Sequence, residues 1–458
     1  MKFLAALLSS FGLVIALGGQ FDPESYDRDD VVTRDIVVVG GGSTGTYAAI
    51  NLLDLGQKVV VVEQESVLGG HTGIYIDPQT NTTIDYGVQS FANFSVVREF
   101  FARFHIPLVR FSVNASTIYA DFESGELFLN STPSYDFDAY KAHLNRYPYL
   151  STGWDLPDPV PEDLLLPFGE FINKHSLQDI AYAIWSSARG SGDILRQPTV
   201  YILKAVDGPF VKGLSEDTLT TEGHNNYELY EKALRELGPD AIVSSTVIAA
   251  QRSTDGVKLV VKTPNGKKLI SASKLLVSVP PNLENMELFD LDGRENGLFQ
   301  RFNHSAWNIA VVANTSLPTS YRFLNIGTDN GTYRIPQLPA IYSINPTAVK
   351  GIFYVWYGVS QAAAEADVKA DISTTIERLS RAIDGSNERT RKVRFLTYKS
   401  HTPFQLAVSI EEIESGFYRE LQALQGYRST WYTGAAFLSH HAGQLWNFTQ
   451  ALLPSLAA

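Results

Sequence analysis

Residues 36–70 read IVVVGGGSTGTYAAINLLDLGQKVVVVEQESVLGG, and this stretch decides the fold. The apolar run at 36–39 predicts a buried strand that ends at consecutive glycines. A helix is predicted over 46–55, and a second apolar run at 58–62 ends at Glu63. A strand, a glycine-rich turn, a helix and a second strand in this order are typical of a βαβ unit that binds a dinucleotide.

Three glycines of the turn have separate roles in such a unit. Gly40 lets the chain leave the strand sharply, Gly42 lacks the β-carbon that would block a diphosphate, and Gly45 lets the helix lie close to the strand. The backbone N–H groups at the start of the helix, at Ser43 and Thr44, have no helical partners and carry partial positive charge. We therefore expect a diphosphate at this helix N-terminus.

Glu63 ends the second strand at the spacing expected of a residue that binds ribose. A carboxylate in this place accepts hydrogen bonds from the sugar hydroxyls of the nucleotide. A glycine turn in another kind of parallel-sheet protein is the alternative, because GxGxxG alone is weak evidence. The flanking strands, the helix and the position of Glu63 favour nucleotide binding.

Two further motifs follow the glutamate. Residues 69–72 read GGHT, and residues 85–89 read DYGVQ. With these motifs in this order, the chain resembles the superfamily of flavin-containing amine oxidases and phytoene desaturases. The resemblance implies FAD as the cofactor, with Gly69 and Gly70 along its phosphate and ribityl chain and the segment around Gln89 near the flavin.

The same resemblance extends to the rest of the cofactor site. It implies that the backbone at Val247 contacts the adenine and that the chain returns to the flavin at Gly434, before a closing helix over 443–453. Superfamily members usually have an acidic residue after this glycine, whereas this chain has Ala435. His71 is the first candidate for close contact with the flavin or for covalent attachment of FAD. A histidine that only packs or hydrogen-bonds phosphate is the alternative.

Other candidates near the flavin are weaker. His401 and the pair His440 and His441 can contact cofactor or substrate, and Lys399 is expected on the surface rather than at the flavin. The sequence marks none of them as a catalytic base. The cysteine count of zero excludes both disulfides and a thioether between flavin and cysteine.

Composition limits the class of protein. The chain has 458 residues and a formal net charge of −12. This length suits an enzyme of about two or three domains with a sizeable core. The acidic balance argues against nucleic-acid binding, which normally needs a basic stripe. No metal site is expected, and after the first residues no segment is apolar enough to cross a membrane.

The N-terminus and the sequons predict a secretory route. Residues 1–19 have the features of a signal peptide, with Lys2 before an apolar body and small residues at its end. Asn-x-Ser/Thr sequons are more numerous than the composition would produce by chance, which predicts a glycoprotein that is secreted or lies in the secretory lumen. Their asparagines are Asn81, Asn93, Asn114, Asn130, Asn303, Asn314, Asn330 and Asn447.

The predicted fold is α/β, with a Rossmann-like FAD-binding domain assembled from discontinuous segments, an α+β substrate domain and a helical insertion. Strands are predicted at 258–263, 268–273 and 275–279, and charged or amphipathic helices at 227–237 and 362–383. The proposed divisions are a signal peptide (1–19), the first part of the FAD domain (35–115), a helical insertion near the substrate (116–225), the second part of the FAD domain (226–283), the substrate domain (284–425) and a C-terminal FAD-binding segment (426–458).

Within the superfamily, the chain resembles the beta-cyclopiazonate dehydrogenase family of fungal flavoproteins. The resemblance implies dehydrogenation of a fungal secondary metabolite by hydride transfer to flavin, with oxidative ring closure as an option. We expect a hydrophobic or aromatic small-molecule substrate, dioxygen as the acceptor, and Trp356 and Tyr357 as the preferred pair of pocket residues.

Three alternatives remain open at this stage. A flavin amine oxidase would release hydrogen peroxide from simple amines. A flavin-dependent double-bond isomerase of unsaturated lipids would leave the mass of its substrate unchanged. A binding or escort protein without flavin would be colourless, although the retained glycines and Glu63 argue against it.

Overall fold

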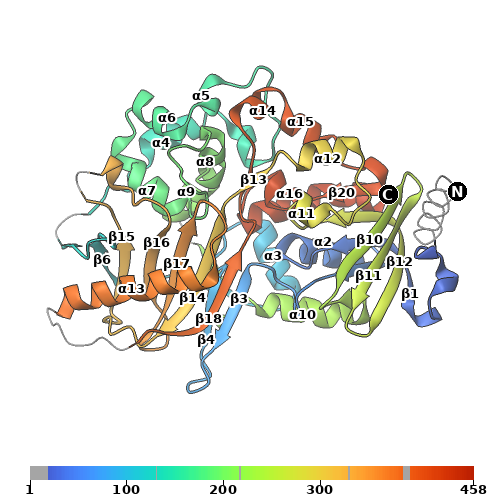
Figure 1. Cartoon of the computed structure of the whole chain (residues 1–458), viewed down its shortest axis with the longest axis horizontal. Helices are drawn as coiled ribbons and strands as arrows, with labels where there is room; N and C mark the ends of the chain where they lie inside the picture. The colour runs from blue at the N-terminus through green and yellow to red at the C-terminus, as the bar shows by residue number, and fades with distance from the viewer. Residues whose placement is uncertain (1–18, 130–131, 216–217, 329–330, 385–391) are drawn as a thin grey trace, which may run out of the picture.

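The computed structural model describes residues 19–129, 132–215, 218–328, 331–384 and 392–458. The chain forms two large sheets side by side, with helices over their faces (Figure 1). The predicted signal peptide, residues 1–19, lies outside the described residues except for its last position. In the described part of the chain, none of the helices has both the length and the hydropathy needed to span a bilayer.

The first sheet, which we call the nucleotide sheet, grows from the two apolar runs of the sequence. β1 pairs in parallel with β2 on one side and with β12 on the other. β20 extends the parallel part beside β12, and β9 extends it beside β2. Its seven strands are β1 (Val31–Val39), β2 (Val59–Val62), β9 (Ala241–Ile242), β10 (Thr246–Ser253), β11 (Gly256–Thr263), β12 (Gly266–Val277) and β20 (Thr430–Tyr432). Burial of the central strands on both faces explains their unbroken valine and isoleucine runs.

Helices from distant parts of the chain pack together against this sheet. They are α2 (Ser43–Asp54), α3 (Ser95–Arg103), α10 (Glu228–Leu237) and α16 (Ala442–Ala457). Tyr47 of α2 stacks on Trp446 of α16, with 5.6 Å between ring centroids. α16 is longer than the predicted 443–453 because its apolar face continues through Leu453 and Leu456, which are 5% and 1% exposed.

The second sheet, which we call the substrate sheet, has the strand order β18-β14-β17-β16-β15-β6-β7. These strands are β6 (Ser116–Ala120), β7 (Leu127–Phe128), β14 (Ala306–Ala313), β15 (Tyr321–Asn325), β16 (Ala340–Pro346), β17 (Ile352–Val359) and β18 (Arg394–His401). The long helix α13 (Glu365–Asp384) lies across one face of the sheet (Figure 1). Its buried side chains, among them Val368, Ile372 and Ile376, close that side.

A layer of short helices covers the other side of the substrate sheet (Figure 1). It comprises α4 (Asp138–Leu144), α5 (Glu162–Leu165), α6 (Phe168–Lys174), α7 (Ala181–Ser187), α8 (Thr199–Ala205) and α9 (Gly208–Ser215). Trp185 of α7 is 1% exposed and stacks on Tyr342 of β16, with 4.5 Å between ring centroids. This contact joins the helical layer to the sheet.

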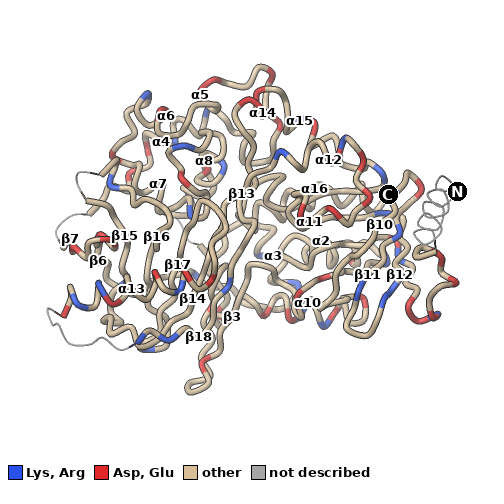
Figure 2. Tube along the Cα trace, viewed as in Figure 1, with Lys and Arg blue, Asp and Glu red and all other residues tan. Residues whose placement is uncertain are grey.

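Shorter elements connect the two halves of the molecule. The small ladders are β3 (Thr72–Ile76) with β4 (Thr83–Gly87), β5 (Leu108–Arg110) with β8 (Leu219–Thr221), and β13 (Asn303–His304) with β19 (Leu406–Ala407). The remaining α-helices are α11 (Leu283–Met286), α12 (Gly293–Phe299), α14 (Ile410–Glu414) and α15 (Phe417–Gln422). Acidic and basic residues are interspersed along the described chain (Figure 2).

A buried ion pair fastens α12 to the nucleotide sheet. The guanidinium of Arg252 on β10 donates to both carboxylate oxygens of Glu295 on α12, at 2.7 and 2.8 Å. Both side chains are 0% exposed. Tyr432 of β20 donates its hydroxyl to the same carboxylate at 3.0 Å. Three separate segments are thus held together by one fully desolvated cluster.

The predicted fold class is confirmed, because a Rossmann-like nucleotide sheet built from separated segments lies beside a second sheet and a helical layer. The strands predicted at 268–273 and 275–279 are in fact one strand, β12. Lys274 does not interrupt it, because its ammonium reaches out to the carbonyl oxygens of Ser455 and Leu456, at 3.0 Å each. The proposed domain divisions stay predictions.

Candidate active site

The glycine turn between β1 and α2 approaches its neighbours very closely. A β-carbon on Gly45 would lie 1.9 Å from the carbonyl oxygen of Gly40. Gly40 itself has a φ of +100°, a conformation that side chains strongly disfavour. The hydroxyl of Ser278, just after β12, donates to the Gly40 carbonyl at 2.8 Å. Protein contacts alone therefore account for glycine at positions 40 and 45.

Gly42 has no such protein neighbour. In the described chain, the nearest atom to a β-carbon placed there would be the Cα of Gly70, 3.9 Å away. Its φ of −68° is one that any residue can adopt. α2 begins directly after it, at Ser43, and none of the described side chains caps that helix end. The open space and the unpaired N–H groups fit the diphosphate of a dinucleotide.

Glu63 stands at the edge of the same space. Its carboxylate accepts hydrogen bonds from the N–H of Gly41 at 2.6 Å and from the N–H of Glu65 at 2.8 Å. The residue is 8% exposed, and this burial raises the pKa of the carboxyl while the two backbone bonds oppose the rise. Each carboxylate oxygen has a further lone pair that a ribose hydroxyl can use. The residues at the turn therefore fit FAD.

The glycine pair at 69–70 lies against the turn and beside a lysine of the other sheet. The ammonium of Lys399 on β18 donates to the Gly70 carbonyl at 2.9 Å. The expectation that Lys399 is a surface residue is therefore wrong, because the end of β18 comes up to the nucleotide turn. Thr72 follows in β3, which pairs with β4 up to Gly87. Gln89 lies just beyond and donates to the carbonyl of Asp85 at 3.1 Å.

Three histidines from distant segments meet next to the glycine pair. The ring of His71 lies 4.1 Å from that of His401 and 5.5 Å from that of Phe404. His440 stacks on Phe404 at 3.9 Å. Burial within the protein lowers the pKa of His71 to about 4 and that of His440 to about 3, and it also lowers the pKa of His401. All three imidazoles are neutral at physiological pH.

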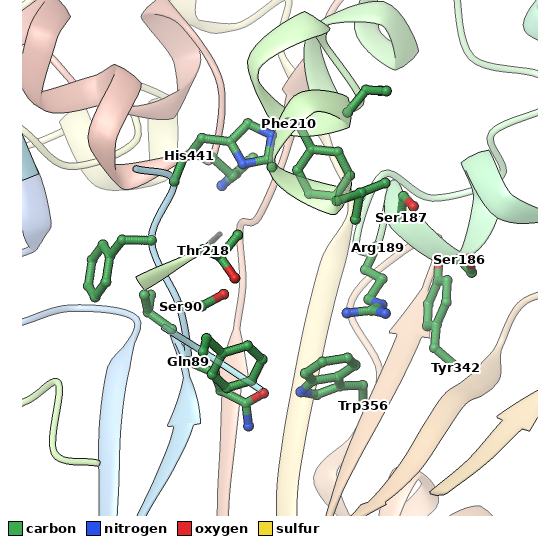
Figure 3. A pocket seen from close by; sticks show the side chains of 18 of the residues that line it. Gln89, Ser90, Ser186, Ser187, Arg189, Phe210, Thr218, Tyr342, Trp356 and His441 are labelled. Atoms are coloured by element: carbon green, nitrogen blue, oxygen red, sulfur yellow. The ribbon is translucent and has the colours of Figure 1, made fainter. Parts of the chain in front are cut away.

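His71 is exposed, and it lies in the wall of a cavity that opens to the surface of the protein. The cavity has a volume of about 1000 Å³ and runs between the substrate sheet and the helical layer (Figure 3). Its aromatic lining includes Tyr182, Phe210, Trp307, Tyr342, Trp356 and Phe404. Polar and charged groups line the rest of the wall, and aromatic rings combined with placed polar groups are typical of a small-molecule site.

Only one of the two preferred pocket residues lies in this cavity. Trp356 is in its wall, but Tyr357 points to the opposite face of β17 and is 3% exposed under α13. The hydroxyl of Tyr357 donates to Asp371 at 2.9 Å. The prediction for Tyr357 is wrong because successive side chains of a strand face opposite sides of a sheet.

The remaining predicted cofactor residues lie on the nucleotide sheet. Val247 is on β10, where it pairs with Val261 and is 8% exposed. Gly434 follows β20 with a φ of +106°, and a β-carbon there would lie 3.4 Å from the carbonyl oxygen of Ser278. The turn at Gly434 therefore meets the turn at Gly40 through Ser278. The predicted contacts of Val247 and Gly434 with FAD stay predictions.

Two residues of the site escaped the sequence analysis. Ser278 joins the two turns, and its place after an apolar strand of a parallel sheet was a usable signal, because ligands bind at the carboxyl ends of such strands. Arg189 enters the large cavity from the loop after α7 (Figure 3). Nothing in its local sequence distinguishes it from other arginines.

A dinucleotide turn on one sheet and a ring-lined cavity over a second sheet fit an enzyme that brings a dinucleotide cofactor to a small molecule. A family model described as FAD dependent oxidoreductase matches residues 35–121. The chain is 41% identical to FAD-dependent oxidoreductase pigF of Monascus ruber, over 100% of this chain and 99% of that relative. It is 34% identical to beta-cyclopiazonate dehydrogenase of Aspergillus oryzae, over 94% of this chain and 95% of that relative. The chain belongs to this family of fungal FAD-dependent oxidoreductases, as its sequence motifs predicted.

Solved structures agree on the fold. The chain is similar to the CLA-producing fatty acid isomerase from P. acnes, with a TM-score of 0.71 and 18% identity over 92% of this chain and 98% of that structure. At this identity the likeness concerns the fold alone. The protein is an FAD-dependent enzyme, and the expectation of an oxidoreductase is confirmed.

Proposed function

We propose that this enzyme dehydrogenates a hydrophobic or aromatic fungal secondary metabolite, with ring closure as an option for the product. The observation that carries the proposal is the cavity of about 1000 Å³, whose aromatic wall ends at His71 beside the glycine pair. Relatives in the family are named oxidoreductases and a beta-cyclopiazonate dehydrogenase. FAD, when bound, supplies the hydride acceptor.

The protein's own residues bind and orient the substrate. Neighbouring rings such as those of Trp307 and Phe404, with centroids 6.3 Å apart, offer apolar surfaces for an aromatic substrate and exclude water from it. At the inner end, the Nε2 atom of His401 is buried and has no hydrogen-bond partner among the described residues. A neutral imidazole there can hydrogen-bond a polar atom of the substrate, as donor or acceptor according to its tautomer.

Product mass tests this function against isomerisation. Metabolite extracts from strains with and without the gene would identify the substrate, which is then incubated with purified enzyme. A dehydrogenase lowers the mass of its substrate by two hydrogens. An unchanged mass would instead support a double-bond isomerase, and peroxide release from simple amines would support an amine oxidase.

We also propose dioxygen as the acceptor and His71 as the site of any covalent link to FAD. The exposure of the His71 imidazole to the cavity, next to Gly70, supports the second part. Denaturing the purified protein and measuring absorbance and peptide mass tests it. FAD released in full on denaturation would exclude a covalent link, and equal turnover under strict anaerobiosis would exclude dioxygen.

We further propose that the protein is a secreted or luminal glycoprotein. Six of its eight sequon asparagines lie in the described residues, and all six side chains are in exposed positions, which supports glycosylation; they are Asn81, Asn93, Asn114, Asn303, Asn314 and Asn447. Asn130 and Asn330 lie outside the described residues. Treatment of the native protein with an endoglycosidase should increase its mobility in gels. An unchanged mobility and retention in the cytosol would contradict this proposal.

A further inference from the structure

Arg189 is a half-buried cation in the wall of the large cavity, and it has no counter-ion among the described residues. Its Nε atom is buried and lacks a hydrogen-bond partner, and the side chain forms no ion pair with any described residue. The guanidinium carbon lies 3.9 Å from the ring centroid of Trp356. Figure 3 shows the side chain reaching down from the helical layer to this indole. A charge that is partly removed from water and has no partner is unfavourable, so its presence calls for a role.

The groups around Arg189 do not neutralise it. Its polar neighbours include the phenols of Tyr342 and Tyr354, and burial raises the pKa of both, so they are uncharged at physiological pH. Burial lowers the pKa of Arg189 only to about 10. The guanidinium therefore keeps its charge, and this part of the cavity is positive.

Other cations of the cavity wall are already engaged. Arg322 donates through Nε to the hydroxyl of Thr117 at 2.7 Å. Lys141 donates to the carboxylate of Asp138 at 3.0 Å, near the outside of the protein. Arg189 differs from both because its guanidinium lies in the cavity with one face against the indole of Trp356. This arrangement leaves the terminal nitrogen atoms of the guanidinium for a ligand. Their planar fork matches the two oxygens of a carboxylate.

A continuous row of rings connects Arg189 to the glycine pair. Trp356 is 6.2 Å from Trp307, Trp307 is 6.3 Å from Phe404, and Phe404 is 5.5 Å from His71. Arg189 is therefore at one end of the aromatic wall, and Gly70 is beyond the other. A charged anchor at one end would decide which part of an elongated substrate reaches the flavin end.

We propose that Arg189 binds a carboxylate of the substrate and thereby fixes its direction in the cavity. The inference rests on the proposed function, since it takes the cavity as the substrate site. It makes Arg189 a specificity-determining residue that selects substrates with an acidic group attached to a ring system.

Binding of a simple aromatic acid tests this without turnover. FAD-loaded enzyme is titrated in a calorimeter with 2-naphthoate and with the neutral 2-naphthamide, which has the same shape. The wild type should prefer 2-naphthoate. R189Q should weaken 2-naphthoate binding by about 10- to 100-fold, the loss expected for a hydrogen bond between charged groups, and leave 2-naphthamide nearly unchanged. R189K, which keeps the charge but not the fork, should fall in between. R381Q, on α13 at the opposite face of the substrate sheet, should behave as wild type.

Several results would overturn the inference. One is equal affinity of the wild type for the two probes, and another is unchanged 2-naphthoate binding in R189Q. Loss of FAD from R189Q and R189K with equal weakening of both probes would assign Arg189 to the cofactor instead. If the probes behave as expected but no metabolite is oxidised, the proposed function fails while the carboxylate site stands.

Discussion

Gly42 and Gly45 look alike in the sequence, but the structure predicts opposite consequences of replacing them. A side chain at Gly42 meets only open space in the protein, because its nearest neighbour is 3.9 Å away. A methyl group at Gly45 would lie 1.9 Å from the Gly40 carbonyl oxygen. Gly42→Val should therefore damage cofactor binding, and Gly45→Ala should damage the fold.

The magnitudes follow from these contacts. Valine at Gly42 fills the space in front of the free N–H groups of α2, and each charged hydrogen bond lost is worth about 1.5–3 kcal/mol. Loss of two such bonds weakens FAD binding by roughly 100-fold or more. The stability of the apoprotein should change by less than about 1 kcal/mol, since the backbone conformation is allowed. Gly45→Ala forces the helix away from the strand, at about 1–3 kcal/mol of unfolding free energy.

Two measurements separate the effects. Urea unfolding of the apoproteins reports stability, and titration with FAD, followed by quenching of its fluorescence, reports affinity. Gly297→Ala on α12, where the new methyl group meets nothing within 4 Å, is the control for both. If Gly42→Val gave a fully loaded, active enzyme, or unfolded as readily as Gly45→Ala, the assignment of the diphosphate to this turn would be refuted.

Three further predictions concern other parts of the molecule. Glu295→Ala removes the fully buried carboxylate partner of Arg252 and leaves only its pair with Asp290, so it should lower the free energy of urea unfolding by roughly 2–4 kcal/mol. A loss below about 1 kcal/mol would contradict the buried pair. Lys399→Met removes the hydrogen bond to Gly70 and should weaken FAD binding about tenfold without changing apoprotein stability, as the same titration would show. The pKa of His440 is about 3 in the folded protein and about 6.5 in the unfolded chain. The unfolded chain therefore binds this proton first as the pH falls, so the contribution of His440 to folding stability is complete above pH 6.5 and is lost toward pH 3. The free energy of urea unfolding of the apoprotein should therefore decline as the pH falls from 6.5 toward 3, and it should decline less steeply in His440→Gln. Equal slopes of unfolding free energy against pH in the two proteins would contradict a buried neutral imidazole.

Patterns that depend on neighbours in sequence were predictable. The strand at 36–39, the helix after it and the strand before Glu63 follow from hydrophobic runs and glycine spacing, and all three are present. The helix predicted at 227–237 is α10, which begins one residue later. Local backbone geometry and burial act over a few residues, so a single sequence records them.

Contacts between distant strands were not predictable. Trp356 and Tyr357 are adjacent aromatic residues in one strand, and no local feature says which of them faces the cavity. Lys399 was assigned to the surface because lysine usually lies there, yet strand pairing carries it to Gly70. Both errors arise because the register and orientation of a strand depend on its partners in the sheet.

The amino-acid order alone determined that this chain builds a dinucleotide turn and belongs with FAD-dependent oxidoreductases, because each step of that turn is specified within about thirty residues. Only the tertiary structure decided what surrounds the turn. It brought three histidines and Lys399 to the glycine pair, and it placed the charge of Arg189 in the cavity wall with no ion-pair partner among the described residues. Burial and charge compensation are properties of residues that meet in space from distant segments, so they emerge only when the two sheets and the helical layer come together.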